Sequence, residues 1–500
     1  MDKSHFGFDV FALVLGMLLP LAFAPLNIYP LGILIPSILF WIIYDTPNKL
    51  AFRRGYLFGF GLFAVGASWI YIAISDFGFT SAPVAFLLTL TFVAFLGLFP
   101  ALQSLLGVVL ARGFPFGAAA FVFALSWLLF EWIRGWFMTG FPWLNLGYSH
   151  INTPLLGFAP VLGVYGLSLI SLLISASLCS LWPVKKIATP LAVGLVLGLF
   201  VTGWSLTSFQ WTEKTGEPIK VAIVQASLPQ ITKWDPEQIR HRMDVYAQMS
   251  EPLWGKYEII MWPENAMTIL WQDAPLLYKD NLQERALETN TALVIGVPYG
   301  DVDTKYYSSL IVLGKKPAVY NKRHLVPFGE YVPLPEFAKK LAGFFQLPMS
   351  GFSHGEKVQN GLEVAGYKMA PSICYEDAFG EELIDFLPEA VVLINGSNNA
   401  WYGKSWAAHQ HLQIARMRAV ETQRQSIRST TTGISALIDE YGQLMQSTNL
   451  HEQTILTGTV QPRQGATPYV RWGNWPVLIL MFIVFSVLLA RLVQLRARQG

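Results

Sequence analysis

The chain has 500 residues, of which 53% are hydrophobic and only 14% are charged, and its formal net charge is +2. Ordinary soluble domains carry about a quarter charged residues, so this composition excludes a wholly soluble chain and indicates a membrane protein with one water-exposed portion. A net charge this close to zero gives no reason to expect nucleic acid as a partner. The two cysteines, Cys179 and Cys374, cannot be a disulfide framework, because Cys179 lies inside an apolar run.

Eight apolar stretches approach the length of about 20 residues that a membrane-spanning helix needs. They are predicted at 8–26, 30–44, 56–75, 83–111, 117–134, 159–182, 190–207 and 474–491. Lys and Arg concentrate in cytoplasmic loops, so their positions give the orientation. The basic residues that fall on one side of this arrangement are Lys49, Arg53, Arg54, Arg112, Lys185, Lys186, Arg491, Arg496 and Arg498. This pattern predicts that both termini are cytoplasmic and that the segment 208–465 lies outside the cytoplasm.

We therefore expect three parts: a bundle of seven transmembrane helices over 1–207, an extracytoplasmic catalytic domain over 208–465, and a last helix with a basic tail over 466–500. The middle part carries short runs rich in β-branched residues, at Ile219–Gln225, Ile259–Trp262, Ala292–Val297, Ser309–Val312, Val391–Ile394 and Ser435–Ile438. Helix-like stretches at 236–252 and 405–424 lie between several of them. This alternation predicts an α/β domain with a largely buried sheet.

Three reactive side chains follow strand-like runs of the middle part. Cys374 stands where an apolar run meets an acidic, helix-compatible stretch, and Glu264 and Lys322 end two earlier runs. A thiol attacks acyl groups as the thiolate, so it needs a base, and Glu264 is the candidate. The attack builds an oxyanion, which Lys322 and the backbone N–H of Tyr375 can stabilise. Together these residues predict an enzyme that makes and breaks an acyl thioester.

Histidines leave two other interpretations open. His324 lies beside Lys322 and permits a Cys–His dyad, in which Lys322 would have no role. His409 and His411 are two apart on an expected helix and point to different faces, with no thiol or acidic cluster beside them. We therefore expect no metal and no cofactor.

The order Glu264, Lys322, Cys374 resembles the nitrilase, or carbon–nitrogen hydrolase, superfamily over about 219–460, whose members share an α-β-β-α sandwich. The motifs Trp262-Pro-Glu264, Lys322–Pro333 and Cys374-Tyr-Glu376, with apolar spans on both sides, resemble the apolipoprotein N-acyltransferase family across the whole chain. That resemblance implies that Glu264 is the general base, Lys322 stabilises the oxyanion and Cys374 is the nucleophile.

The resemblance also implies supporting residues and substrate contacts. Glu330, Tyr375 and Glu376 match supporting positions beside the triad, and Trp234 matches an aromatic residue at the substrate entrance. The apolar segment 341–352 is either a lid that admits acyl chains through Phe344 and Phe345 or a buried core segment.

The implied reaction moves a fatty acyl chain from a phospholipid, through a Cys374 thioester, to the α-amine of a diacylglyceryl-cysteine at a prolipoprotein N-terminus. Covalent catalysis of this kind predicts ping-pong kinetics. We expect a monomer in the bacterial inner membrane, in contact with membrane lipids, with the catalytic domain on the periplasmic side. Two alternatives are a membrane-anchored nitrilase-like amidase that releases its thioester to water, and a catalytically inactive membrane scaffold.

Overall fold

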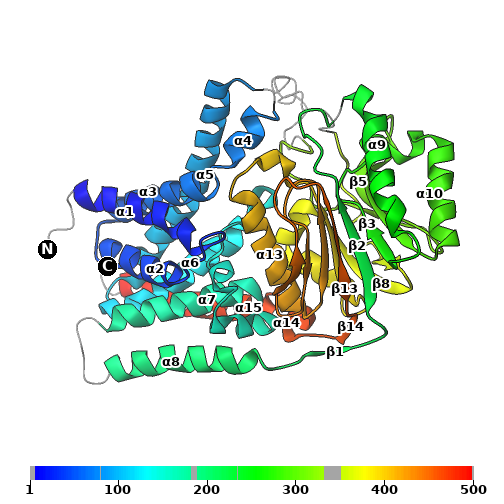
Figure 1. Cartoon of the computed structure of the whole chain (residues 1–500). Coiled ribbons are helices and arrows are strands. Elements are labelled where there is room, and N and C mark those ends of the chain that lie inside the picture. Colours follow the sequence, from blue (N-terminus) through cyan, green and yellow to red (C-terminus); the bar gives the residue numbers. More distant parts are fainter. Residues whose placement is uncertain (1–5, 79, 182–187, 234, 332–350, 498–500) are drawn as a thin grey trace. The chain divides into compact units, whose positions relative to one another are not determined.

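The chain folds into two compact units in the computed structural model, which describes residues 6–78, 80–181, 188–233, 235–331 and 351–497 (Figure 1). Unit 1 comprises Met1–Ile70, Pro83–Phe209 and Arg471–Gly500. Unit 2 comprises Tyr71–Ala82 and Gln210–Val470.

Unit 1 is built from apolar helices. They are α1 (Phe6–Leu18), α2 (Pro30–Ile43), α3 (Asn48–Gly66), α5 (Ala82–Ala111), α6 (Phe116–Arg134), α7 (Ala159–Ser180), α8 (Ala188–Leu206) and α15 (Trp475–Ala497). Short 3₁₀ turns join some of them: η1 (Leu19–Ala22), η2 (Phe137–Thr139), η3 (Leu146–His150) and η4 (Pro154–Phe158). Within the described part of the chain, five helical segments are long and apolar enough to cross a membrane. They are Ala82–Ala111, Phe116–Arg134, Pro154–Ser180, Thr189–Leu206 and Trp475–Gln494, while Phe6–Ala22 and Pro30–Ile43 are apolar but shorter.

The span predicted at 56–75 is wrong in its bounds. Helix α3 ends at Gly66, and the rest of the stretch forms a separate short helix, α4 (Ile70–Ser75). At its other end, α3 begins at Asn48, so the basic residues Lys49, Arg53 and Arg54, which we expected in a loop, lie in the first two turns of a helix.

A buried ion pair explains why α3 accommodates this charge. The guanidinium of Arg54 is fully buried, and its Nε donates to Oδ1 of Asp9 in α1 at 3.1 Å. Its Nη1 also donates to the carbonyl of Ile42 at 2.6 Å. A buried charge is tolerated when it is paired and hydrogen-bonded, so Asp9 allows α1, α2 and α3 to meet around Arg54.

Replacing Asp9 by Ala is expected to destabilise unit 1 by about 3–5 kcal/mol, because the Arg54 charge would stay buried without its partner. The measurement is the thermal unfolding of the full chain in detergent. The double variant Asp9→Ala/Arg54→Leu is the control and should recover most of the loss. A melting temperature that does not change in Asp9→Ala would contradict a stabilising role for this pair.

Unit 2 contains two six-stranded sheets. The first has the order β13-β2-β3-β4-β5-β6, with β13 (Thr454–Val460), β2 (Ile219–Gln225), β3 (Ile259–Met261), β4 (Ala292–Asp301), β5 (Lys305–Leu313) and β6 (Ala318–Asn321). The second has the order β12-β11-β10-β9-β8-β7, with β12 (Leu444–Ser447), β11 (Ala436–Ile438), β10 (Ser426–Thr430), β9 (Val392–Ser397), β8 (Tyr367–Ile373) and β7 (Leu362–Val364). A separate two-stranded sheet pairs β1 (Thr212–Lys214) with β14 (Arg463–Gly465).

The helices of unit 2 complete the list of elements. They are α9 (Pro236–Ser250), α10 (Leu276–Glu288), α12 (Gly380–Leu383), α13 (Ala407–Thr422) and α14 (Pro468–Trp472), with 3₁₀ turns η5 (Glu251–Leu253), η6 (Trp271–Asp273), η7 (Cys374–Ala378), η8 (Ile384–Phe386) and η9 (Asn399–Tyr402). The start of α9 is set by local sequence: the Asp235 carboxylate accepts the N–H of Glu237, and Pro236 occupies the first turn, where its missing N–H costs nothing.

The two sheets pack face to face because successive side chains of a strand point to opposite faces, and both faces are apolar. Val221 and Ile223 of β2 lie in one buried cluster with Ile373 of β8 and Ile394 of β9. The intervening residues of β2 face the other way, where Val224 packs in a cluster with α9 and α10. Helix α13 covers the outer face of the second sheet through contacts with β11. Figure 1 shows α9 and α10 on one side of these strands and α13 on the other, a helix–sheet–sheet–helix arrangement.

The six predicted strand runs all fall on observed strands, and the predicted helices at 236–252 and 405–424 correspond to α9 and α13. Strands β2, β3 and β4 are mutually parallel, as are β8, β9 and β10. Two antiparallel pairings, β4 with β5 and β5 with β6, give β6 the direction of β3. The carboxyl ends of β3 and β6 therefore share one edge of the first sheet, and those of β8 and β9 share one edge of the second.

Candidate active site

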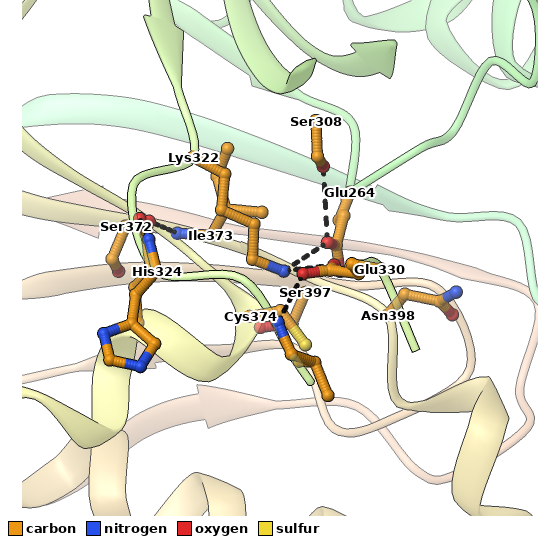
Figure 2. Close-up of polar contacts among 12 residues, drawn as sticks. Glu264, Ser308, Lys322, His324, Glu330, Ser372, Ile373, Cys374, Ser397 and Asn398 are labelled. Carbon is orange, nitrogen blue, oxygen red and sulfur yellow. Dashed lines mark hydrogen bonds and ion pairs between the residues drawn. The ribbon is translucent and has the colours of Figure 1, made fainter. Parts of the chain in front are cut away.

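The predicted triad residues lie at the carboxyl ends of three strands. Glu264 follows β3, Lys322 comes directly after β6, and Cys374 comes directly after β8 as the first residue of η7. Figure 2 shows the side chains of Glu264, Lys322, Glu330 and Cys374 converging on one point. The structure therefore brings together residues that are up to 110 positions apart in sequence, from Glu264 to Cys374.

Lys322 is a fully buried cation between two carboxylates. Its Nζ lies 3.1 Å from Oε1 of Glu264 and 2.5 Å from Oε1 of Glu330. Burial alone would lower the pKa of Lys322, but the two carboxylates raise it well above its ordinary value. The hydroxyl of Ser308 also donates to Oε1 of Glu264 at 3.4 Å, and the N–H of Val326 donates to Oε2 of Glu330 at 2.8 Å. This lysine is therefore charged and fixed in position.

Cys374 is a protonated thiol in the resting site. Burial, with a smaller contribution from Glu264, raises its pKa to about 12, against the opposing effects of Lys322 and a hydrogen bond from the backbone N–H of Asn398. A thiol with this pKa is almost wholly protonated near neutral pH, so attack on an acyl group requires a base that removes the proton during the reaction. Glu264 pairs with Lys322 and raises the pKa of the thiol, and its role as this base remains a prediction.

Glu376 joins the Lys322 loop to the Cys374 strand. Its carboxylate accepts the backbone N–H of Arg323 at 2.6 Å and of His324 at 3.1 Å, both just after Lys322. It also accepts the N–H of Ile373, directly before the cysteine, at 2.7 Å, and the hydroxyl of Tyr320 at 3.0 Å. One buried side chain thus fixes the spacing between the two chain segments that carry the cation and the thiol.

The Cys–His dyad that the sequence left open does not fit this geometry. Nδ1 of His324 lies 2.8 Å from Oε1 of Glu382, and its ring stacks on Phe379 with centroids 3.6 Å apart. Figure 2 shows the His324 ring pointing away from Cys374. The ring of Tyr375 packs against the same Phe379 at 5.2 Å, and a role for its backbone N–H remains a prediction.

Some predicted residues lie outside the part of the chain that the structure describes. These are Trp234 and the two aromatic residues of the apolar segment, Phe344 and Phe345. At the end of that segment, the Phe352 ring contacts Tyr306 at 5.1 Å, and its N–H donates to the carbonyl of Glu330 at 3.1 Å. Across the described residues there is no group of three or more His, Cys, Asp or Glu side chains placed to hold a metal ion.

Sequence reasoning missed the residues that surround the triad. Ser308 lies inside β5, Asn398 follows β9, and His411 lies in α13, where its Nε2 is 3.0 Å from the carbonyl oxygen of Cys374. Lys233 is a further buried cation whose pKa is lowered to about 7 by burial, although Glu264 opposes this. Only Asn398 carried a usable signal, because it follows a buried strand at the sheet edge where β8 ends.

Comparisons with known proteins show what the chain is similar to. Residues 15–177 match the apolipoprotein N-acyltransferase N-terminal domain, and residues 220–469 match the carbon–nitrogen hydrolase domain. An apolipoprotein N-acyltransferase of Methylococcus capsulatus is 38% identical over 481 residues, which cover 96% of this chain and 95% of the relative. One of Azotobacter vinelandii is 40% identical over 500 residues, covering 98% and 96%. The solved structure of the C. elegans NitFhit protein aligns with a TM-score of 0.40 and 17% identity, over 55% of this chain and 65% of that one.

The two packed sheets and the domain match define unit 2 as a carbon–nitrogen hydrolase fold of the nitrilase type. The match extends through the apolar helices on both sides of that fold. At about 40% identity over nearly the full length, the chain belongs to the apolipoprotein N-acyltransferase family.

Alkylation of Cys374 by iodoacetamide is expected to accelerate about tenfold per pH unit between about pH 7 and 10 without reaching a plateau, because a pKa of about 12 keeps the thiolate fraction rising throughout. The rate is measured in a Cys179→Ala background, so that only one thiol reacts. A free cysteine peptide, whose ordinary pKa is about 8.5, is the control and should level off. A plateau for Cys374 below pH 9 would show a thiolate in the resting site.

Proposed function

We propose that this chain is an N-acyltransferase that moves a fatty acyl chain from a phospholipid to the α-amine of the diacylglyceryl-cysteine at the N-terminus of an apolipoprotein. The observation that carries the proposal is the convergence of Glu264, Lys322 and Cys374 in the carbon–nitrogen hydrolase fold of a chain with apolar helices long enough to span a membrane. Both substrates are lipids, so an enzyme anchored in the bilayer can reach them where they reside.

The first step forms the thioester. Glu264 takes the proton of Cys374 while Sγ attacks the ester carbonyl of the phospholipid, and the oxyanion develops beside the charged Nζ of Lys322. As the C–O bond breaks, the proton passes from Glu264 to the leaving oxygen, and a lysophospholipid departs. Glu330 keeps Lys322 charged and oriented, and Glu376 holds the two segments together.

The second step transfers the acyl group. The neutral α-amine of the acceptor attacks the thioester carbonyl, Glu264 removes a proton from the nitrogen, and the sulfur of Cys374 leaves and regains a proton. An N–C bond forms and the S–C bond breaks, so the enzyme returns to its starting state. Because the first product leaves before the second substrate reacts, the kinetics should be ping-pong.

The finer arrangement belongs to the same proposal. We assign a transmembrane bundle to 1–207, the catalytic domain to 208–465 and a last span with a basic tail to 466–500, with eight crossings in total. Both termini are cytoplasmic, and the catalytic domain faces the periplasm of a bacterial inner membrane, as the distribution of Lys and Arg indicates. The enzyme acts as a monomer, and Trp234, Phe344 and Phe345 contact substrate.

Intact mass spectrometry of the full chain in phospholipid tests the reaction. Wild type is expected to gain the mass of one acyl chain as a thioester on Cys374. Cys374→Ser is expected to gain no acyl chain, because a serine hydroxyl is a much weaker nucleophile here. Addition of a diacylglyceryl lipopeptide should clear the adduct and N-acylate the peptide. Clearance by water alone would indicate a hydrolase, and a folded wild type without any adduct would indicate an inactive scaffold.

Replacing Glu264 by Gln is expected to slow thioester formation about 10²–10⁴-fold, because the general base is lost. The same change removes a negative charge that raises the pKa of Cys374, so alkylation by iodoacetamide at pH 9 should not slow. Glu363→Gln is the control, since Glu363 forms an ion pair with Lys316 on the surface. Parallel losses of acylation and alkylation in Glu264→Gln would mean a damaged site and not a missing base.

A further inference from the structure

The backbone of Cys374 adopts a conformation that L residues rarely occupy. Its φ is +53°, in the left-handed region, at the junction of β8 and η7. A residue other than glycine stays in this region only when its surroundings hold it there, and such positions are frequent at active sites. The contacts that hold Cys374 therefore decide where its sulfur points.

One of these contacts is a hydrogen bond from His411 to the backbone carbonyl of Cys374. His411, in α13, is buried, and its Nε2 lies 3.0 Å from the Cys374 carbonyl oxygen. A carbonyl can only accept, so Nε2 carries the proton and donates. The other ring nitrogen, Nδ1, lies 3.1 Å from the side-chain nitrogen of Asn399 and accepts from it. The imidazole is therefore fixed in a single neutral tautomer.

The charged groups around His411 keep it neutral. Burial, and then the nearby guanidinium of Arg428, hold the pKa of His411 well below its ordinary value. Oδ2 of Asp377 approaches Nε2 to 4.0 Å, but it also accepts from Nη1 of Arg428 at 2.8 Å. Arg428 Nη2 lies 3.5 Å from the side-chain oxygen of Asn399, which orients the amide so that its nitrogen faces His411.

The neighbouring residue reaches the sulfur of the same cysteine. The backbone N–H of Asn398 forms a hydrogen bond with the Cys374 thiol, which favours the thiolate. Asn398 is itself fixed, because its Oδ1 accepts the N–H of Ala400 at 3.2 Å and the hydroxyl of Thr431 at 2.6 Å. The dipeptide Asn398-Asn399 thus contacts the sulfur directly and the carbonyl through His411.

We propose that His411 is a positioning residue for Cys374, which holds the cysteine backbone in its left-handed conformation through the Nε2–H···O=C bond and so aims the sulfur at the acyl carbonyl. This inference rests on the proposed role of Cys374 as nucleophile. In this proposed role, His411 contacts neither Glu264 nor substrate. Its loss should therefore slow formation of the thioester and leave the binding of phospholipid almost unchanged.

The test compares two replacements of the same histidine in the full-length enzyme. His411→Leu keeps the volume but removes the donor, and it should lower the rate constant of thioester formation about 100-fold, with KM for phospholipid changed less than about threefold. His411→Gln retains an N–H that can reach the Cys374 carbonyl, and it should recover the rate to within about fivefold of wild type. His409→Leu, two residues earlier on α13 and therefore on a different face of that helix from His411, is the matched control and should behave as wild type.

Two further measurements separate positioning from a general structural role. The alkylation rate of Cys374 across pH 7–10 should differ from that of wild type in His411→Leu but not in His411→Gln. The melting temperatures of the two variants are compared in the same detergent. Asn399→Ala leaves His411 in place but removes the hydrogen bond to Nδ1 that fixes its tautomer, and should lower the acylation rate about tenfold. This variant tests the same role if His411→Leu does not fold.

The outcomes are distinct. The positioning role would be overturned if His411→Leu had the same acylation rate and the same alkylation rate as wild type. It would also be overturned if the acylation rates of His411→Leu and His411→Gln fell only in proportion to their melting temperatures. If folded wild type forms no thioester, the proposed function fails, and His411 is then judged by the alkylation rates alone. A rate loss in His411→Leu that Gln restores would establish the inference.

Discussion

The site depends on a lysine that water cannot reach. Lys322 is fully buried, and the cost of removing its charge from water is offset by Glu264 and Glu330. Burial keeps the Cys374 thiol protonated, and Glu264 and Glu330 add to this effect while Lys322 opposes it. The two carboxylates also keep Lys322 a cation, and in the proposed mechanism one of them, Glu264, is the base. The charge of Lys322 thus follows from this cluster of three ionisable groups, and the proposed activation of Cys374 depends on the same cluster.

The cluster would be of no use without a fixed distance to the cysteine, and the fold supplies that distance from two sheets. Glu264 and Lys322 leave one sheet and Cys374 leaves the other. Apolar packing between sheets does not define position to the fraction of an ångström that catalysis needs. Glu376 does, because each of its hydrogen bonds is directional and it accepts from both segments. Hydrophobic burial brings the parts together, and buried polar contacts align them.

Much of this was predictable from sequence, and the remainder has a physical reason. The run Ile219–Gln225 coincides with β2 because its consecutive apolar residues, from Val221 to Val224, suit a strand that is buried on both faces. Parallel strands bring their carboxyl ends to one edge of a sheet, but Glu264 and Cys374 follow strands of different sheets, so their meeting was predicted only from the family resemblance. His411 gave no such signal, because a histidine on a helix looks the same whether it faces a carbonyl or a core. Arg54 was expected in a loop, since its partner Asp9 lies 45 residues away and hydropathy considers each residue alone.

The protonated state of Cys374 also determines how the enzyme fares between turnovers. Peroxides attack thiolates far faster than thiols, and the oxidation of a cysteine beyond the sulfenic acid is irreversible in most proteins. A thiol with a pKa of about 12 presents almost no thiolate near neutral pH. The other cysteine of the sequence, Cys179, lies in the apolar helix α7 of unit 1, and neither cysteine forms a disulfide. The burial that raises the pKa of Cys374, and so creates the need for a base, therefore also protects this thiol from oxidation.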